Sequence, residues 1–216
     1  MKPCARPIAL LLVLLVLAAL SACTSSPPRP PRAKPAPVAV VRAAPKPSLN
    51  KGDPDQRFKA ALQLVKDNKR DEAQDAFAQL AADFPEYSGP LTDLGILFAQ
   101  ARHREAALAS LSKAVAANPH NAIALNWLGI VYRQQGDYAQ AEQAYRNALA
   151  ARPDYAAAHL NLGILYDLCL RRPQDALEQY REYQRYAGED QLMVSVWIKE
   201  LEAGRGTLTA ARNDLP

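Results

Sequence analysis

The sequence predicts an all-α protein made of about four stacked helix-turn-helix units, followed by a further helix that caps the C-terminal end. Three columns of residues carry this prediction, since the members of each column are 34 residues apart. The columns are Gly95, Gly129 and Gly163; Pro85, Pro119 and Pro153; and Ala73, Ala107 and Ala141. One period shared by three columns indicates a repeated unit, and such units bury a continuous core by stacking.

The first 22 residues have the composition of a signal peptide. Lys2 and Arg6 carry positive charge, no acidic residue is present, and an apolar run of 13 residues extends from Ile8 to Leu20. A run of this length is too short to cross about 30 Å of hydrocarbon as a helix. We therefore expect residues 1–22 to be a leader.

The end of this leader resembles the cleavage site of bacterial lipoproteins. Ser21 and Ala22 are small, and Cys23 follows them directly. The resemblance implies that Cys23 becomes the acylated first residue of the mature chain, which is then held on a membrane by its lipid. Thr24 stands where inner-membrane lipoproteins carry aspartate, which implies the periplasmic face of the outer membrane. An ordinary signal peptide with a chance cysteine, or an uncleaved membrane anchor, are the alternatives.

Residues 23–52 predict a proline-rich, basic and disordered spacer. They contain eight prolines, six cationic residues and no acidic residue. At about 3.1 Å per residue such a segment reaches roughly 90 Å. Its charge suits anionic lipid headgroups, although a purely soluble linker has the same composition. Eight of the 26 basic residues precede Asp53, so the remainder, with 18 basic and 22 acidic residues, gives no reason to expect nucleic-acid binding.

Four repeat units fill residues 53–188, with the boundaries 54–87, 88–121, 122–155 and 156–188. The third carries the clearest pattern, Leu128-Gly129-Ile130-Val131-Tyr132. In each unit a small residue allows two helices to approach closely, and in the first three units proline follows the second helix and ends it. The first unit is degenerate, with Ala60-Ala61 in place of Leu-Gly. The fourth has one extra residue before Ala176 and Gly188 where proline is expected.

These motifs resemble the tetratricopeptide repeat. That family implies a solenoid of helical pairs which binds a peptide or a protein domain in a concave groove lined by the first helix of each pair. Carried over position by position, the family geometry predicts groove residues in two columns with a rim. These are Phe58, Thr92, Asn126 and Leu160; Leu62, Ile96, Ile130 and Ile164; and, on the rim, Arg133 and Asp167. Ordinary core packing is the alternative for the aliphatic column.

Residues 189–204 predict a capping helix. Its apolar stripe ends at Gly204 and comprises Met193, Val194, Trp197, Ile198 and Leu201. The stripe suits the exposed end of the fourth unit, and a partner-binding helix is the alternative. We expect residues 205–216 to be a frayed tail.

The sequence offers little for catalysis. His103, His120 and His159 form no metal-ligand pair, and Cys169 at the end of a first helix suits packing better than redox chemistry. No phosphate-binding glycine loop or nucleophile motif occurs. We therefore expect no enzyme, no cofactor, no metal and no small-molecule substrate.

The expected function is that of a periplasmic adaptor which binds partner proteins. A lipid anchor combined with tetratricopeptide repeats resembles type IV pilus assembly lipoproteins, and this favours a role in building or stabilising an envelope machine of the pilus or secretion type. Scaffolds of cell-wall hydrolases and repeat proteins of TonB-type energy-transducing systems have the same layout. An unrecognised enzyme and a purely structural tether are the remaining alternatives.

Overall fold

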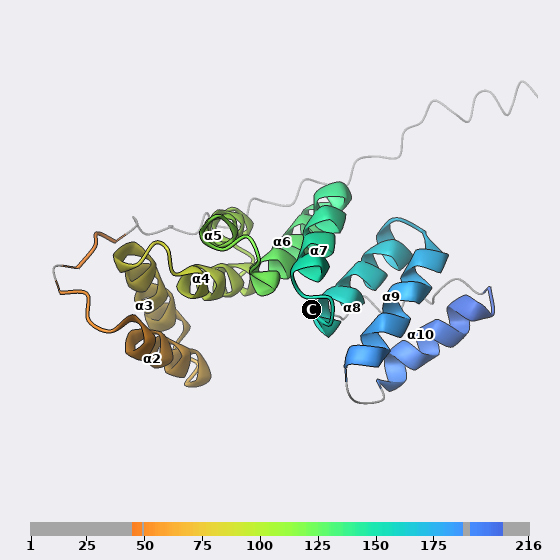
Figure 1. Cartoon of the computed structure of the whole chain (residues 1–216), viewed down its shortest axis with the longest axis horizontal. Helices are drawn as coiled ribbons and strands as arrows, with labels where there is room; N and C mark the ends of the chain where they lie inside the picture. Colours follow the sequence, from red (N-terminus) through yellow and green to blue (C-terminus); the bar gives the residue numbers. More distant parts are fainter. Residues whose placement is uncertain (1–44, 49, 188–190, 205–216) are drawn as a thin grey trace, which may run out of the picture. The chain divides into compact units, whose positions relative to one another are not determined.

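The computed structural model describes residues 45–48, 50–187 and 191–204 (Figure 1). These all belong to one compact unit, residues 41–216. The predicted leader, Cys23, most of the predicted spacer, Gly188 and the predicted tail lie outside the described residues. None of the helices in the described part is long and apolar enough to cross a membrane.

The described residues form nine α-helices packed in sequential pairs, which confirms the predicted all-α array. The second helix of each pair also packs against the first helix of the next pair, and helix α6 contacts both α4 and α8. The helices of the four pairs are α2 (Pro54–Lys66) and α3 (Arg70–Asp83); α4 (Ser88–Gln100) and α5 (Arg104–Ala117); α6 (Ala122–Gln135) and α7 (Tyr138–Ala151); and α8 (Ala156–Ile164) and α9 (Pro173–Tyr186).

The glycine column marks the closest approach within a pair, as predicted. A Cβ atom placed on Gly95 would lie 2.6 Å from Cγ of Leu111, and one on Gly163 would lie 2.6 Å from the Tyr180 ring. At Gly129 the atom would overlap the ring of Tyr145. A larger side chain at these positions therefore forces the two helices apart.

The turn inside each pair has the same backbone form although its sequence varies. Asn68, Arg102, Gly136 and Arg171 all have positive φ values, between 53° and 84°. Only one of the four is glycine. The other three accept a left-handed conformation that side chains normally disfavour, because the turn ends one helix and starts the next within a few residues.

The extra residue of the fourth unit is absorbed before this turn. In the third unit the amide of Asp137 donates to the carbonyl of Tyr132 at 3.0 Å, and in the fourth the amide of Arg172 donates to Tyr166 at 2.8 Å. The same hydrogen bond thus spans five residues in one unit and six in the other. The additional residue widens the end of α8 into a π-helical turn, η1 (Leu165–Cys169).

The last residues of the predicted spacer are bound to the first helical pair. The backbone amide and the hydroxyl of Ser48 both donate to the carboxylate of Asp83 at the end of α3, the hydroxyl at 3.0 Å. Gln79 donates to the carbonyl of Lys46 at 2.8 Å, and the Lys51 ammonium lies 5.5 Å from the centre of the Phe84 ring. The described end of the predicted spacer is therefore part of the folded body.

The other end of the array is covered by helix α10 (Leu192–Glu202), which packs against α9. Val194, Trp197 and Ile198 are buried, and the Trp197 and Tyr180 ring centres are 5.4 Å apart. Met193 departs from the predicted stripe, because it is 53% exposed. It lies next to the exposed Leu192 at the start of the helix, on the side away from the core.

Candidate protein-binding surface

The predicted aliphatic column divides into two halves. Leu62 and Ile96 are half-buried on α2 and α4. Ile130 and Ile164 are only 8% and 4% exposed and belong to one hydrophobic cluster that also contains Trp197 of α10. The expectation of an exposed column therefore fails at Ile130 and Ile164, where the alternative of core packing holds. The two members that keep partial solvent access, Leu62 and Ile96, lie in the first two units.

Two polar groove candidates are buried and hold neighbouring units together. Thr92 accepts a hydrogen bond at 2.9 Å from the side chain of Asn121, which precedes α6. Asn126 on α6 accepts one at 3.0 Å from Asn161 on α8. Both Thr92 and Asn126 are less than 5% exposed, so their hydrogen-bonding groups serve the stacking of the units.

The two rim candidates are half-buried and point to tyrosines of their own pair. Asp167 accepts a hydrogen bond at 3.1 Å from the Tyr180 hydroxyl. Burial raises the pKa of Tyr145 to about 12, and the charge of Arg133 opposes this rise. The two residues are equivalent members of successive units, and each faces the tyrosine that covers its glycine. Asp167 thus contacts its own pair, while Arg133 lies near Tyr145 of its own pair and also near Cys169 of the next pair.

The remaining candidates lie on partly open surface. Leu160 on α8 packs against the cluster of Ile130 and Ile164 while staying half-buried. The half-buried Phe58 on α2 packs its ring against Phe77 and Tyr87, with ring centres 5.8 and 5.5 Å apart. One helical turn on from Phe58 lies Leu62, and Val65, which is 37% exposed, follows it. Helix α2 thus carries an apolar stripe with solvent access.

Asp93 on α4 is a further member of this region which the groove prediction left out. It is half-buried, and burial raises its pKa to about 6. No ion pair involves it within the part of the chain that the structure describes. The signal was present in the sequence, because Asp93 is the one charged residue of α4. Such a carboxylate favours contact with a cation or a hydrogen-bond donor.

We call this region the first-helix surface and define it by five residues on the first helices of units one and two. They are Phe58, Leu62, Val65, Asp93 and Ile96. The surface combines partly exposed apolar side chains with one carboxylate that lacks an ion pair among the described residues. It is suited to an apolar segment that also brings a hydrogen-bond donor or a cation.

The histidines and the cysteine are dispersed over the array. His103 lies against Phe98, His120 is exposed in a loop, and His159 is buried. The described residues include no cluster of side chains that could hold a metal ion. Cys169 is half-buried, and burial raises the pKa of its thiol, which lowers the fraction of reactive thiolate.

Comparisons with known families are consistent with this array. Models described as tetratricopeptide repeat match residues 57–87, 92–146 and 120–187. A comparison of the sequence with curated proteins gave no match.

Several solved structures are similar to the chain. PilF of Pseudomonas aeruginosa superimposes with a TM-score of 0.63 at 21% identity, covering 70% of this chain and 68% of its own. TTC0263, a thermophilic TPR protein of Thermus thermophilus, gives 0.59 at 27% identity, covering 71% and 84%. MamA gives 0.56 at 19% identity, covering 64% and 80%. At identities of 21% and 19%, the similarities to PilF and MamA concern the fold alone.

Proposed function

Because the chain belongs to the tetratricopeptide repeat family, whose members mediate protein-protein binding, we propose that it is a non-enzymatic adaptor which captures a partner protein on its first-helix surface. The observation that carries the proposal is the contrast within the predicted groove. Ile130 and Ile164 are core residues, whereas Leu62 and Val65 on α2 and Ile96 on α4 keep solvent access, and the half-buried Asp93 lies on α4 as well. A few side chains on such a surface can carry most of the binding energy.

The proposal places the adaptor on the periplasmic face of the outer membrane, anchored by lipid on Cys23. Its support is the sequence, in which a short apolar leader ends in small residues directly before Cys23. Cys23→Ser removes the only thiol that can accept the diacylglyceryl group at that site. Labelling with a fatty-acid analogue tests the anchor, and equal label in the wild type and the variant would refute it.

Within the envelope, we propose that the adaptor helps to assemble or stabilise a machine of the pilus or secretion type. The layout of anchor, spacer and repeats supports this role, and the fold similarity to PilF agrees with it. Scaffolding of cell-wall hydrolases or of a TonB-type system is the second candidate, and it rests on the same layout. Purification of membrane complexes through the lipidated chain, with identification of the proteins retained, discriminates between the two.

Paired substitutions test the surface itself. Leu62→Asp and Ile96→Asp place charge on half-buried positions, so we expect partner capture to be lost while helical circular dichroism is retained. Ile130→Asp places the same charge in the core, so we expect the third and fourth units to unfold. Capture that survives both Leu62→Asp and Ile96→Asp would locate the partner elsewhere on the array.

A further inference from the structure

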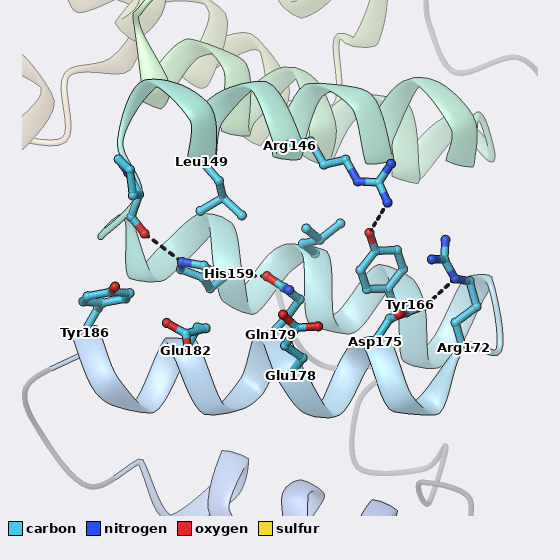
Figure 2. Close-up of a pocket in the computed structure, with 12 residues that line it drawn as sticks. Arg146, Leu149, His159, Tyr166, Arg172, Asp175, Glu178, Gln179, Glu182 and Tyr186 are labelled. Carbon is cyan, nitrogen blue, oxygen red and sulfur yellow. Dashed lines mark hydrogen bonds and ion pairs between the residues drawn. The ribbon is translucent and has the colours of Figure 1, made fainter.

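A groove separate from the first-helix surface lies between helices α7 and α9, with α8 as its floor (Figure 2). Its volume is about 470 Å³, within the range of ordinary ligand pockets. Leu149, Leu162 and Pro153 supply apolar lining; the edge formed by α9 is lined by Asp175, Glu178 and Glu182, and the edge formed by α7 by Arg146. The groove thus lies along the second helices of units three and four, away from the residues of the first-helix surface.

The groove coincides with a break in the regular packing between units. The first helices of units two and three carry Leu91 and Leu125 at their fourth position, and both are buried. The fourth unit has His159 at this position. Its Nε2 donates to the carbonyl of Pro153 at 2.9 Å, and its Nδ1 lies 2.9 Å from the side-chain oxygen of Gln179. The imidazole of His159, held by contacts at both ring nitrogens, therefore stands in place of the buried leucine found in units two and three.

Negative charge exceeds positive charge along this groove. Arg146 and Arg172 are both paired with Glu142, at 2.7 and 3.1 Å, and Arg172 is also paired with Asp175 at 2.5 Å. These pairs neutralise the end of the groove near Tyr166 (Figure 2).

Two further carboxylates lie along α9 towards the opposite end. Among the described residues, the exposed Glu178 makes no ion pair, and Glu182 is paired with the neighbouring exposed Arg185 at 3.0 Å. Both side chains project from α9, Glu182 below His159 towards Tyr186 and Glu178 further along the helix next to Gln179 (Figure 2). The charge of Glu178 is therefore uncompensated among the described residues, which favours a cation beside it.

An aromatic ring completes that end. Tyr186, 39% exposed, stacks on His159 with ring centres 5.6 Å apart and an angle of 23° between the planes. One face of the tyrosine ring is thus held by a buried side chain that is itself hydrogen-bonded. An arginine or lysine beside such a ring gains from the cation–π interaction in addition to the carboxylates.

We propose that this groove binds an extended, arginine- or lysine-bearing segment of a partner protein, with one cationic side chain beside Glu178 and another beside Glu182 and Tyr186. Helix α9, which lines the groove from Asp175 to Tyr186, has 14 residues and is about 21 Å long, which corresponds to some six or seven residues of extended chain. The segment therefore runs along the groove and places its cationic side chains along α9, from Glu178 to Tyr186. This surface is independent of the first-helix surface, so the adaptor has two faces for two different kinds of segment.

The test uses the full chain and a dye-labelled peptide of three Arg-Pro repeats, which is extended and basic. Binding is measured by fluorescence anisotropy, with Gln-Pro and Glu-Pro peptides of the same length as comparison. We expect the double variant Glu178→Gln/Glu182→Gln to weaken binding of the Arg-Pro peptide at least tenfold, equivalent to about 1.4 kcal/mol. The Gln-Pro and Glu-Pro peptides should bind at least tenfold more weakly than Arg-Pro.

Matched variants separate this site from general charge attraction. Glu105→Gln removes one exposed carboxylate from α5, outside the groove, and should leave binding unchanged. Leu62→Asp on the first-helix surface should also leave it unchanged, so failure here is distinct from failure of the proposed function. Undetectable binding of the Arg-Pro peptide, equal binding of the Gln-Pro peptide, or full binding by the double variant would each overturn the proposal.

Discussion

The first and last helical pairs of the array are covered in different ways. At α3, the buried carboxylate of Asp83 accepts hydrogen bonds from Ser48, Arg57 and Gln79, and these hold the preceding chain in place. At α9, Trp197 of helix α10 packs its ring on Tyr180. The N-terminal cover thus depends on charge and hydrogen bonds, and the C-terminal cover depends on apolar area. The two should respond differently to truncation, overpacking and pH.

Trp197→Ala should lower the free energy of unfolding more than any other substitution considered below. The side chain is 3% exposed, and its removal leaves a cavity against Tyr180, so we expect a loss of about 3–5 kcal/mol in the free energy of unfolding. Urea denaturation of the full chain measures it. Leu192→Ala on the exposed side of the same helix, at 78% exposure, is the control and should cost less than about 0.5 kcal/mol. Equal effects of the two variants would mean that α10 does not cap the array.

Gly129→Leu tests the packing of an interior helical pair, against which the stability effects at the two ends can be compared. The new side chain would overlap the Tyr145 ring, so we expect a loss of about 1–3 kcal/mol through forced separation of α6 and α7. Thermal unfolding followed by circular dichroism measures the change. Ala60→Leu, an exposed substitution on α2, should leave the melting temperature nearly unchanged. An unaltered melting temperature for Gly129→Leu would contradict the close helix contact.

Asp83→Asn tests the N-terminal cover through pH. Burial raises the pKa of Asp83, but hydrogen bonds from Ser48, Arg57 and Gln79 outweigh it and lower the pKa from 3.8 to about 2. The ionised carboxylate therefore stabilises the fold above about pH 4, and this contribution is lost as the pH falls towards 2. We expect the variant to be less stable at pH 7, by less than Trp197→Ala.

Melting curves of the wild type and the variant between pH 2 and pH 7 test this dependence. The gap between their melting temperatures should narrow below pH 4. Asp71→Asn, an exposed substitution in the first turn of α3, serves as the control and should show no such trend. A gap that stays constant down to pH 2 would contradict the role of charge in the N-terminal cover.

Asp93→Asn should change the free energy of unfolding least, and at pH 8 it should raise this free energy, whereas the other substitutions lower it. Burial raises the pKa of Asp93 from 3.8 to about 6, so its ionisation costs stability as the pH rises from about 4 to 6. Removing the charge should therefore stabilise the chain at pH 8 by about 1 kcal/mol and leave it unchanged at pH 4. Urea denaturation at the two pH values checks this. Destabilisation at pH 8 would show that the carboxylate has a favourable partner.

The period of the sequence predicted the packing inside each pair because that packing repeats. Gly95, Gly129 and Gly163 meet a large side chain of their own second helix, a contact that every unit makes independently of its neighbours. The extra residue of the fourth unit was visible in the sequence, but its place in a π-helical turn was not. Several positions between Tyr166 and Arg172 could have absorbed it with the same spacing on either side.

The burial of the predicted groove residues depends on contacts with neighbouring helices, and the 34-residue period of the sequence carries no information about those contacts. Ile96 and Ile130 occupy equivalent positions, yet only Ile130 joins the cluster that extends to α10. The bound end of the spacer did leave a sequence signal. Asp83 stands where the second and third units have Ala117 and Ala151, and a buried acid at a terminal unit implies donors from outside the repeat.

The grip of Asp83 on the chain before α2 also determines how the array would carry force. Tension applied ahead of Lys46 reaches the Gln79 and Asp83 side chains of α3 before it reaches Pro54, the first residue of α2. The hydrogen bonds of Ser48 would then have to break before the first helix could be peeled from its partner. A pull transmitted from a bound protein would therefore strain these hydrogen bonds first. The helical pairs would stay intact until the hydrogen bonds break.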